Sequence, residues 1–240
     1  MRSLRLVAWA LAGGLLSWCT PPSAKAPIPA GTPFAYRLAV RWDGALFEEG
    51  ARVVETNLGY RVGVRALYVG LGSLELVACP DEAAVAALTA SVARADHAWD
   101  ADASRLDALS AARLTDEGEL LLGAATASGA DYCELFWTVG TVDAQASDGF
   151  ELARAAAHLE GWVDAPDGER RPLDVWLTVG EGVRVPLEDA WTPGAELRLT
   201  TAPGRAFDDL AFDALSDVEI LFEVIQALGN GSRARFAAPP

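Results

Sequence analysis

Apolar and polar residues alternate along several short stretches of this chain, and the alternation predicts β-strands. Between residues 34 and 43 the apolar positions are Tyr36, Leu38, Val40 and Trp42, and two arginines lie among the alternate positions. A period of two with aromatic and branched side chains is typical of a half-buried strand. The same pattern predicts strands within residues 60–65, 66–78, 132–142, 158–163, 173–179, 183–187 and 196–200.

Glycine and proline mark the expected breaks between these strands. Gly70 and Gly72 should interrupt the run 66–78 with a turn or a bulge. The sequence Ala-Pro-Asp-Gly at 165–168 has turn composition, so the strands around it should form a hairpin. Trp162 and Trp176 lie opposite the apolar faces of that hairpin, where we expect them to pair and to form an exposed binding face. Burial of both rings under an inserted segment is the alternative.

Helices are predicted at two places. Pro80 is followed by two acids, as at a helix start, and residues of about 80–115 are expected to form an inserted, partly helical segment. Ser216 and Glu219 have the spacing of a capping box before an apolar stripe that ends near Gly229, which predicts a C-terminal helix.

The number and order of these elements indicate the fold class. Many short strands without a β-α-β rhythm predict a mainly β protein, an antiparallel β-sandwich with the inserted segment and the C-terminal helix. We expect residues 34–240 to form a single domain.

The first residues have the order of an export signal. Two arginines precede an apolar run at 6–16, which is too short to cross a bilayer, and small residues follow. A leucine and a serine shortly before Cys19 resemble a lipobox, which predicts a signal peptide at 1–19 and lipid on Cys19. Cleavage after residue 26 is the soluble alternative. Residues 20–33 are rich in proline and alanine and are expected to form a tether. The protein should therefore be exported, either to the periplasm or to a lipid anchor on the outer membrane.

Charge and cysteine content narrow the chemistry. The formal net charge of −15 repels phosphate backbones, so we expect no nucleic-acid partner. Cys79 and Cys133 are the two cysteines left after signal removal, and an oxidising compartment predicts a disulfide between them. Two separate buried thiols or a metal-binding pair are the alternatives.

Candidate metal ligands and catalytic groups are few. His97 stands near Asp96 and Asp100, a set that would suit copper or zinc, and a solvated acidic loop is the alternative. The other histidine, His158, is expected on the surface of a strand. The sequence contains no Gly-x-Ser-x-Gly, no His-Glu-x-x-His and no phosphate-binding loop, so we expect no enzyme. A hydrolase built on paired carboxylates is the third hypothesis for function.

Two segments carry a resemblance to a known group of proteins. Residues 55–62, Glu-Thr-Asn-Leu-Gly-Tyr-Arg-Val, run on to Leu-Glu-Leu-Val-Ala-Cys at 74–79, and residues 206–215 read Ala-Phe-Asp-Asp-Leu-Ala-Phe-Asp-Ala-Leu. Together they resemble uncharacterised bacterial periplasmic proteins and lipoproteins related to the methanobactin-associated copper-binding proteins (metallo-mystery pair). The resemblance implies a periplasmic β-sandwich, copper as cofactor and a dihaem peroxidase-like partner. The chain lacks the Trp-x-Trp element and the four-cysteine pattern of that group, so no copper ligand is carried over.

These features together predict a non-catalytic binding protein of the cell envelope that needs no cofactor. Its partner should be another envelope protein or a small ligand. A periplasmic copper-binding protein is the alternative.

Overall fold

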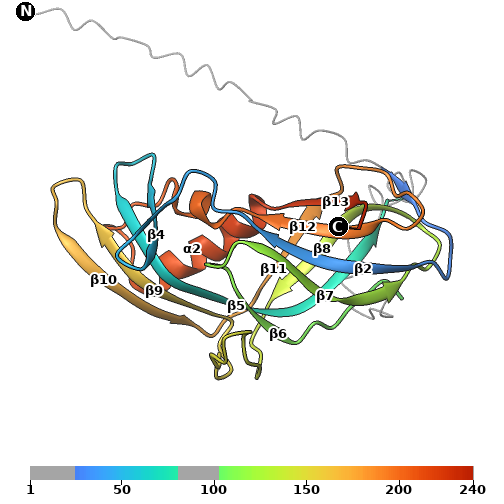
Figure 1. Ribbon diagram of the computed structural model, residues 1–240, viewed down its shortest axis with the longest axis horizontal. Coiled ribbons are helices and arrows are strands. Elements are labelled where there is room, and N and C mark those ends of the chain that lie inside the picture. Colours follow the sequence, from blue (N-terminus) through green and yellow to red (C-terminus); the bar gives the residue numbers. More distant parts are fainter. Residues whose placement is uncertain (1–24, 81–102, 240) are drawn as a thin grey trace, which may run out of the picture.

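The computed structural model describes residues 25–80 and 103–239, and this part of the protein is mainly β. One sheet of nine strands and one of four are accompanied by an α-helix near the C-terminus, which confirms the predicted fold class (Figure 1). Every pairing between these strands is antiparallel except that of β12 with β2. The elements are β1 (Ala26–Pro27), β2 (Pro33–Val40), β3 (Leu46–Glu48), β4 (Ala51–Glu55), β5 (Arg61–Ala78), β6 (Ser110–Arg113), β7 (Gly118–Thr126), β8 (Asp131–Val139), β9 (Ala157–Asp164), β10 (Arg170–Leu177), β11 (Glu181–Pro186), β12 (Glu196–Thr201), the 3₁₀ turn η1 (Pro203–Phe207), α2 (Asp217–Asn230) and β13 (Arg233–Ala237).

The 18-residue strand β5 is the spine of the larger sheet. Its first half pairs with β9 on one side and β4 on the other, whereas its second half pairs with β8 and, near the middle, with β6. Strand β10 extends the sheet beyond β9, and β11 extends it beyond β8. At about 3.3 Å per residue β5 is about 60 Å long, so one continuous strand joins two ends with different neighbours.

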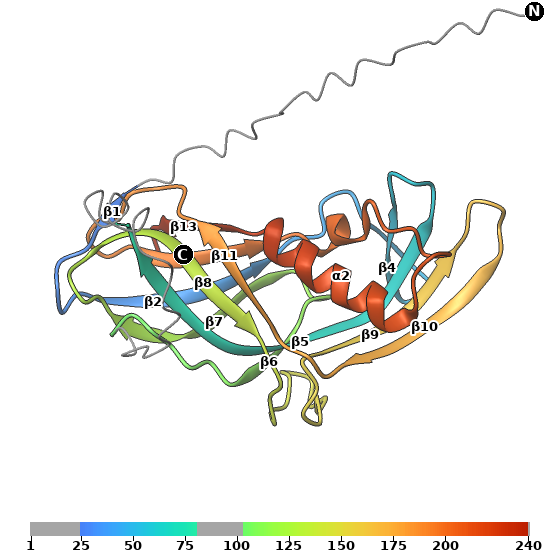
Figure 2. The same ribbon diagram turned by 180° about the vertical axis from the view of Figure 1, so that it is seen from behind.

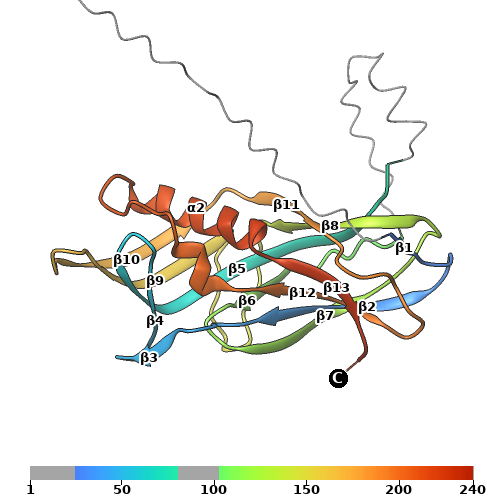
Figure 3. The same ribbon diagram turned by 90° about the horizontal axis from the view of Figure 1, so that it is seen from above.

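Different elements cover the two ends of the concave face of the larger sheet. Figures 2 and 3 show α2 over β9 and β10 at one end, and the sheet β13-β12-β2-β7 facing β5 and β8 at the other. Leu38 of β2, Trp137 of β8 and Leu221 of α2 belong to the same buried core. The protein is therefore a sheet-on-sheet sandwich at one end and a helix-on-sheet layer at the other.

Two buried aromatic side chains, one in β2 and one just after it, bind backbone carbonyls on either side of β6. Trp42 donates its indole N–H to the carbonyl of Leu114 at 2.6 Å. The hydroxyl of Tyr36 donates to the carbonyl of Ser104, also at 2.6 Å. These bonds satisfy polar groups that burial would otherwise leave unpaired, and they fix the two sheets relative to each other at this side.

The folded domain begins earlier than the sequence predicted. Strand β1 pairs with β8, opposite Tyr132, and both Ala26 and Ile28 are buried. Residues 26–28 are therefore part of the fold and not of a tether, because Ala26 and Ile28 pack into the core.

Two predictions about the middle of the chain differ in outcome. The run 66–78 stays within β5, so no turn divides it; the predicted irregularity is a register shift between Leu71 and Ser73, at Gly72, and further shifts follow Val64 and Val77. The described part of the predicted helical insertion, residues 103–115, contains β6 and no helix. Its polar and small residues pair with β5 instead. The rest of that insertion lies outside the described residues.

The C-terminal helix forms as predicted. The Ser216 hydroxyl accepts the Glu219 N–H, and the Glu219 carboxylate accepts the Ser216 N–H at 2.8 Å, which completes the capping box. The helix ends at Asn230, one residue past Gly229, and a methyl group on Gly229 would overlap Val183 of β11. No helix in residues 25–80 and 103–239 has both the length and the apolar character needed to cross a membrane.

Candidate functional site

Four aromatic rings form a row on the outer face of the larger sheet, the face turned away from α2. Strand register places Tyr68 of β5, His158 of β9 and Trp176 of β10 side by side. Phe150, from the loop between β8 and β9, adds a ring that contacts all three. These four residues are called the aromatic row below.

The rings of the aromatic row stack nearly parallel. The Tyr68 and Phe150 centroids are 4.0 Å apart with an interplanar angle of 10°, and those of His158 and Trp176 are 4.1 Å apart with an angle of 21°. Phe150 links the two pairs, because its centroid is 5.2 Å from that of His158. An aromatic pair of this kind contributes about 0.5–1.5 kcal/mol beyond its buried area, so the row fixes the orientation of each ring.

A charged pair closes the Tyr68 end of the row. The Tyr68 hydroxyl donates to Asp148 Oδ2 at 2.6 Å, and Arg113 donates to the same oxygen at 3.1 Å. Burial, together with the hydrogen bond to Asp148, raises the pKa of Tyr68 to about 12. The same hydrogen bond holds the pKa of Asp148 below its usual range. At neutral pH this end is therefore a neutral phenol bound to a carboxylate, which anchors the β8–β9 loop.

His158 lies buried in the middle of the row, which corrects the predicted surface position. The residue is only 5% exposed because Phe150 and Trp176 cover its ring. Nε2 donates to Asp174 Oδ1 at 2.9 Å, and Nδ1 is buried without a hydrogen-bond partner. His158 therefore supports the neighbouring indole and offers no nitrogen to a ligand from solvent.

The two tryptophans predicted to form a binding face differ in exposure. Trp176 is 41% exposed at the free end of the row, whereas Trp162 is 3% exposed. They do not pair across the hairpin, because Trp162 is opposite Pro172 and Trp176 is opposite His158. The expectation of exposure is thus wrong for Trp162.

The physical reason is that Trp162 is covered by the β3–β4 hairpin and by two arginines. The indole packs with apolar residues of β4. The guanidinium carbons of Arg170 and Arg61 lie 3.9 and 5.2 Å from its ring centroid, and both arginines pair with Asp164. Among the described residues, the cover of Trp162 is therefore a hairpin and a charged cluster.

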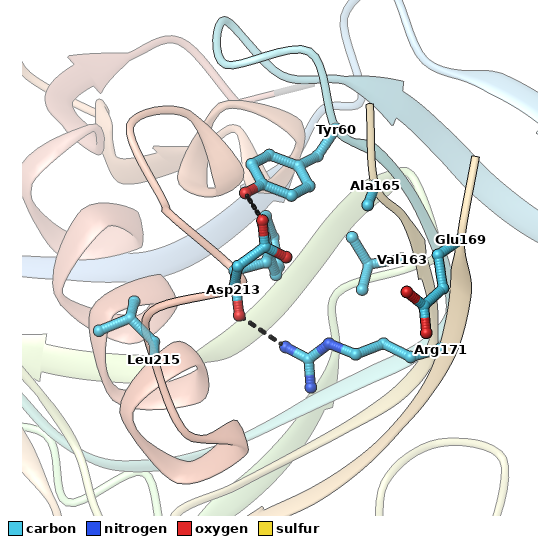
Figure 4. Close-up of a pocket in the computed structure, with 8 residues that line it drawn as sticks. Tyr60, Val163, Ala165, Glu169, Arg171, Asp213 and Leu215 are labelled. Carbon is cyan, nitrogen blue, oxygen red and sulfur yellow. Dashed lines mark hydrogen bonds between the residues drawn. The ribbon is translucent and has the colours of Figure 1, made fainter. Parts of the chain in front are cut away.

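A pocket of about 350 Å³ opens near the start of α2 (Figure 4). Tyr60 donates its hydroxyl to Asp213 at 2.7 Å, and this bond raises the pKa of Tyr60. Arg171 binds the carbonyl of Phe212 at 3.1 Å and forms an ion pair with Asp217. Most polar groups here are thus paired with one another, and the space would admit a small polar ligand. The lining residues are Tyr60, Val163, Ala165, Glu169, Arg171, Phe212, Asp213 and Leu215.

The two segments that carry the family resemblance meet beside this pocket. Asn57 donates from Nδ2 to Asp209 Oδ1 at 2.6 Å, and its own Oδ1 accepts the Asp209 N–H at 2.8 Å. The Tyr60–Asp213 bond is a second link between the same segments. These polar residues therefore join the β4–β5 turn to the segment before α2.

The predicted metal ligands His97, Asp96 and Asp100, like the lipidation residue Cys19, lie outside the described residues. Among the residues that are described, no three His, Cys, Asp or Glu side chains are grouped as ligands of one metal ion. Cys79 and Cys133 form a disulfide with Cα atoms 4.9 Å apart, which confirms the predicted pair. Neither of these two is a free thiol.

Sequence patterns missed two members of the aromatic row. Tyr68 stands in a run that is apolar on both faces, and Phe150 stands in a loop without periodicity. The aromatic residues opposite one another on neighbouring strands were the available signal, but they can be matched only once the strand register is known.

Comparison with protein-family models, with curated proteins and with solved structures found no match to this chain.

Proposed function

We propose that this protein is an exported, non-catalytic binding protein of the cell envelope that contacts a partner protein through Trp176. The observation that carries this proposal is an indole that is 41% exposed and yet fixed by stacking on His158. An aromatic side chain held in one orientation loses little entropy on binding, and such residues are enriched at interfaces. Asp174 and Glu160 stand exposed beside it on paired strands, so the surface is both aromatic and anionic.

The chemistry of the aromatic row supports binding over catalysis. A general base needs a lone pair within reach of a substrate proton. Nε2 of His158 donates a hydrogen bond to Asp174, and Nδ1 of the same ring is buried. Tyr68 is bound to Asp148, and its pKa of about 12 makes it a weak proton donor at neutral pH. A hydrolase is accordingly the third proposal.

Export and lipid attachment belong to the same proposal. The character of residues 1–19 and the Cys79–Cys133 disulfide both favour an oxidising compartment outside the cytoplasm. If Cys19 carries lipid, the six residues 20–25 separate it from β1, and an extended chain of this length reaches about 25 Å. The β1 end would then face the membrane and the hairpin β9–β10 would point away (Figure 2).

Mass spectrometry of the native N-terminus tests the anchor. We expect a lipid-modified Cys19 as first residue. An unmodified N-terminus farther along the chain would mean a soluble protein.

A periplasmic copper-binding protein is the second proposal. It rests on His97 with Asp96 and Asp100, and on the resemblance of residues 55–79 and 206–215 to the copper-binding group. Metal analysis of protein purified from its native envelope tests it. Copper that is stoichiometric and lost in His97→Ala would favour this function, whereas copper-free protein would reject it.

Photo-crosslinking in the native envelope tests the binding role. The crosslinking residue p-benzoylphenylalanine replaces Pro172, which lies on the same exposed face of β10 as Trp176. We expect one discrete adduct that is lost in Trp176→Ala, and none when the crosslinker replaces Glu223 on the exposed side of α2. Adducts that are equal at both positions, or unchanged in Trp176→Ala, would contradict the proposal.

A further inference from the structure

In the described part of the protein, the arginines that stack on aromatic rings share one arrangement. There are four such contacts, and in each the guanidinium also binds a carboxylate. A guanidinium is planar and weakly hydrated, so it can stack on a ring and hold a carboxylate at the same time. The sets are Arg52 with Phe47 and Glu117, Arg61 with Trp162 and Glu48, Arg113 with Tyr68 and Asp148, and Arg170 with Trp162 and Asp164.

The closest of these contacts shows how strand geometry builds the site. Trp162 and Asp164 are two residues apart on β9, so they project from the same face of the sheet. Arg170 lies directly opposite Asp164 on β10. Its guanidinium carbon is 3.9 Å from the centroid of the indole, and its Nε and Nη2 donate to the two Asp164 oxygens at 2.6 and 2.9 Å. One strand thus supplies the ring and the carboxylate, and the neighbouring strand supplies the arginine.

Strand β10 carries the same pair of side chains one strand farther out. Asp174 and Trp176 are two residues apart on the outer face; the Asp174 side chain is 72% exposed. His158 and Phe150 both stack against the indole, and His158 binds Asp174 Oδ1. The rest of the indole, which is 41% exposed, and Asp174 Oδ2 face solvent. Among the described strands β10 pairs with β9 alone, so its other side is a sheet edge. None of the four arginine contacts involves Trp176.

We propose that Trp176 and Asp174 form a receptor site for an arginine of a partner protein, presented by an extended segment along the free edge of β10. The guanidinium stacks on the exposed part of the indole and binds Asp174, as Arg170 does with Trp162 and Asp164. This inference rests on the proposed function and names the chemistry of its partner. The net charge of −15 and the exposed Glu160 opposite Asp174 favour a basic segment over an acidic one.

Short peptides test the arginine site directly. The probe is acetyl-Thr-Val-Arg-Val-Thr-amide, with lysine and citrulline counterparts, and binding is followed by NMR shifts of the β10 amides. We expect the arginine peptide to bind most tightly and the neutral, equally shaped citrulline peptide at least about fivefold more weakly. Trp176→Leu, which keeps an apolar side chain without the π face, and Asp174→Asn should each weaken binding about two- to fivefold. Glu223→Gln on α2 is the matched control for general charge and should leave affinity unchanged.

The results separate this inference from the function on which it rests. Equal binding of the arginine and citrulline peptides, or an equal loss in Asp174→Asn and Glu223→Gln, would overturn the arginine site. If crosslinking at position 172 still depended on Trp176, the contact surface would stand while its arginine partner would be rejected. Arginine-selective binding without any crosslinked partner would keep the site and reject its use in the envelope.

Discussion

Gly63 lies directly beneath the indole of Trp162, so closely that a methyl group on Gly63 would overlap the ring. The two residues are opposite each other on β5 and β9. Because Gly63 has no side chain, the indole lies against the sheet, where Arg61 and Arg170 stack on it. With the indole in this position, the β3–β4 hairpin and the two arginines bury Trp162, whereas Trp176, on the next strand, is exposed.

The Gly63→Ala variant tests this contact. We expect it to lower the free energy of unfolding by about 1–3 kcal/mol, since the added methyl group must displace the ring or the strand in a packed site. Chemical denaturation measures the change. Gly140→Ala is the matched control, because a Cβ there meets no atom within 4 Å, and its effect should stay below about 0.5 kcal/mol. A Gly63→Ala protein as stable as the wild type would show that the indole does not lie over this residue.

The hydrogen bond from Tyr68 to Asp148 should make stability depend on pH at both extremes. The pKa of Tyr68 is raised to about 12 from an ordinary value near 10, so its contribution is complete below pH 10 and is lost as pH rises through 12. The pKa of Asp148 is lowered, so its contribution is present above the ordinary carboxyl pKa and is lost as pH falls through the lowered one.

Tyr68→Phe removes the phenol and its hydrogen bond to Asp148, and so provides the comparison. Wild type should be the more stable protein at neutral pH, and the difference from Tyr68→Phe should shrink toward pH 12 and in acid. Denaturant titrations across pH measure it. A constant difference between the two proteins over this range would mean that the pair does not contribute as described.

Much of the fold was predictable where one face of an element is buried and the other is solvated. The alternation in β2 and in β10 follows directly from that asymmetry. The middle of β5 is buried on both faces, and β7 is largely exposed on both, so neither alternates. For that reason the sequence pattern predicted a break within β5 and gave no indication of β7.

The exposure of the candidate site residues could not be predicted for a related reason. Trp162 and Trp176 occupy equivalent positions in the alternating pattern, and only their neighbours differ. The cover over Trp162 comes from a hairpin distant in sequence, and the stacking beside Trp176 depends on Phe150 of a loop. The Ser216 cap and the disulfide were predictable because each needs only local spacing or a count of cysteines.

The capping box of α2 gives a third prediction. Ser216→Ala should lower the free energy of unfolding by about 1 kcal/mol, because the Glu219 N–H loses its acceptor. Hydrogen bonds from Ser216 also hold the pKa of Glu219 below its usual range, so the contribution of the box is lost as pH falls through that lowered value. Thermal melts at neutral and acid pH measure both effects. Ser147→Ala, at an exposed serine outside any helix, is the control.

The fourth prediction concerns the disulfide, which ties the end of β5 to β8 where the two strands are already paired. Because Cys79 and Cys133 are separated by 54 positions, the chain-entropy estimate for the closed loop is about 4 kcal/mol. We therefore expect the double variant Cys79→Ala, Cys133→Ala to lose about that free energy of unfolding in denaturant titrations. Cys19→Ala should leave stability unchanged, since Cys19 is not part of the pair. Wild-type protein from the native envelope should show no free thiol at Cys79 or Cys133, and alkylation of either one without prior reduction would contradict both the bond and the oxidising compartment.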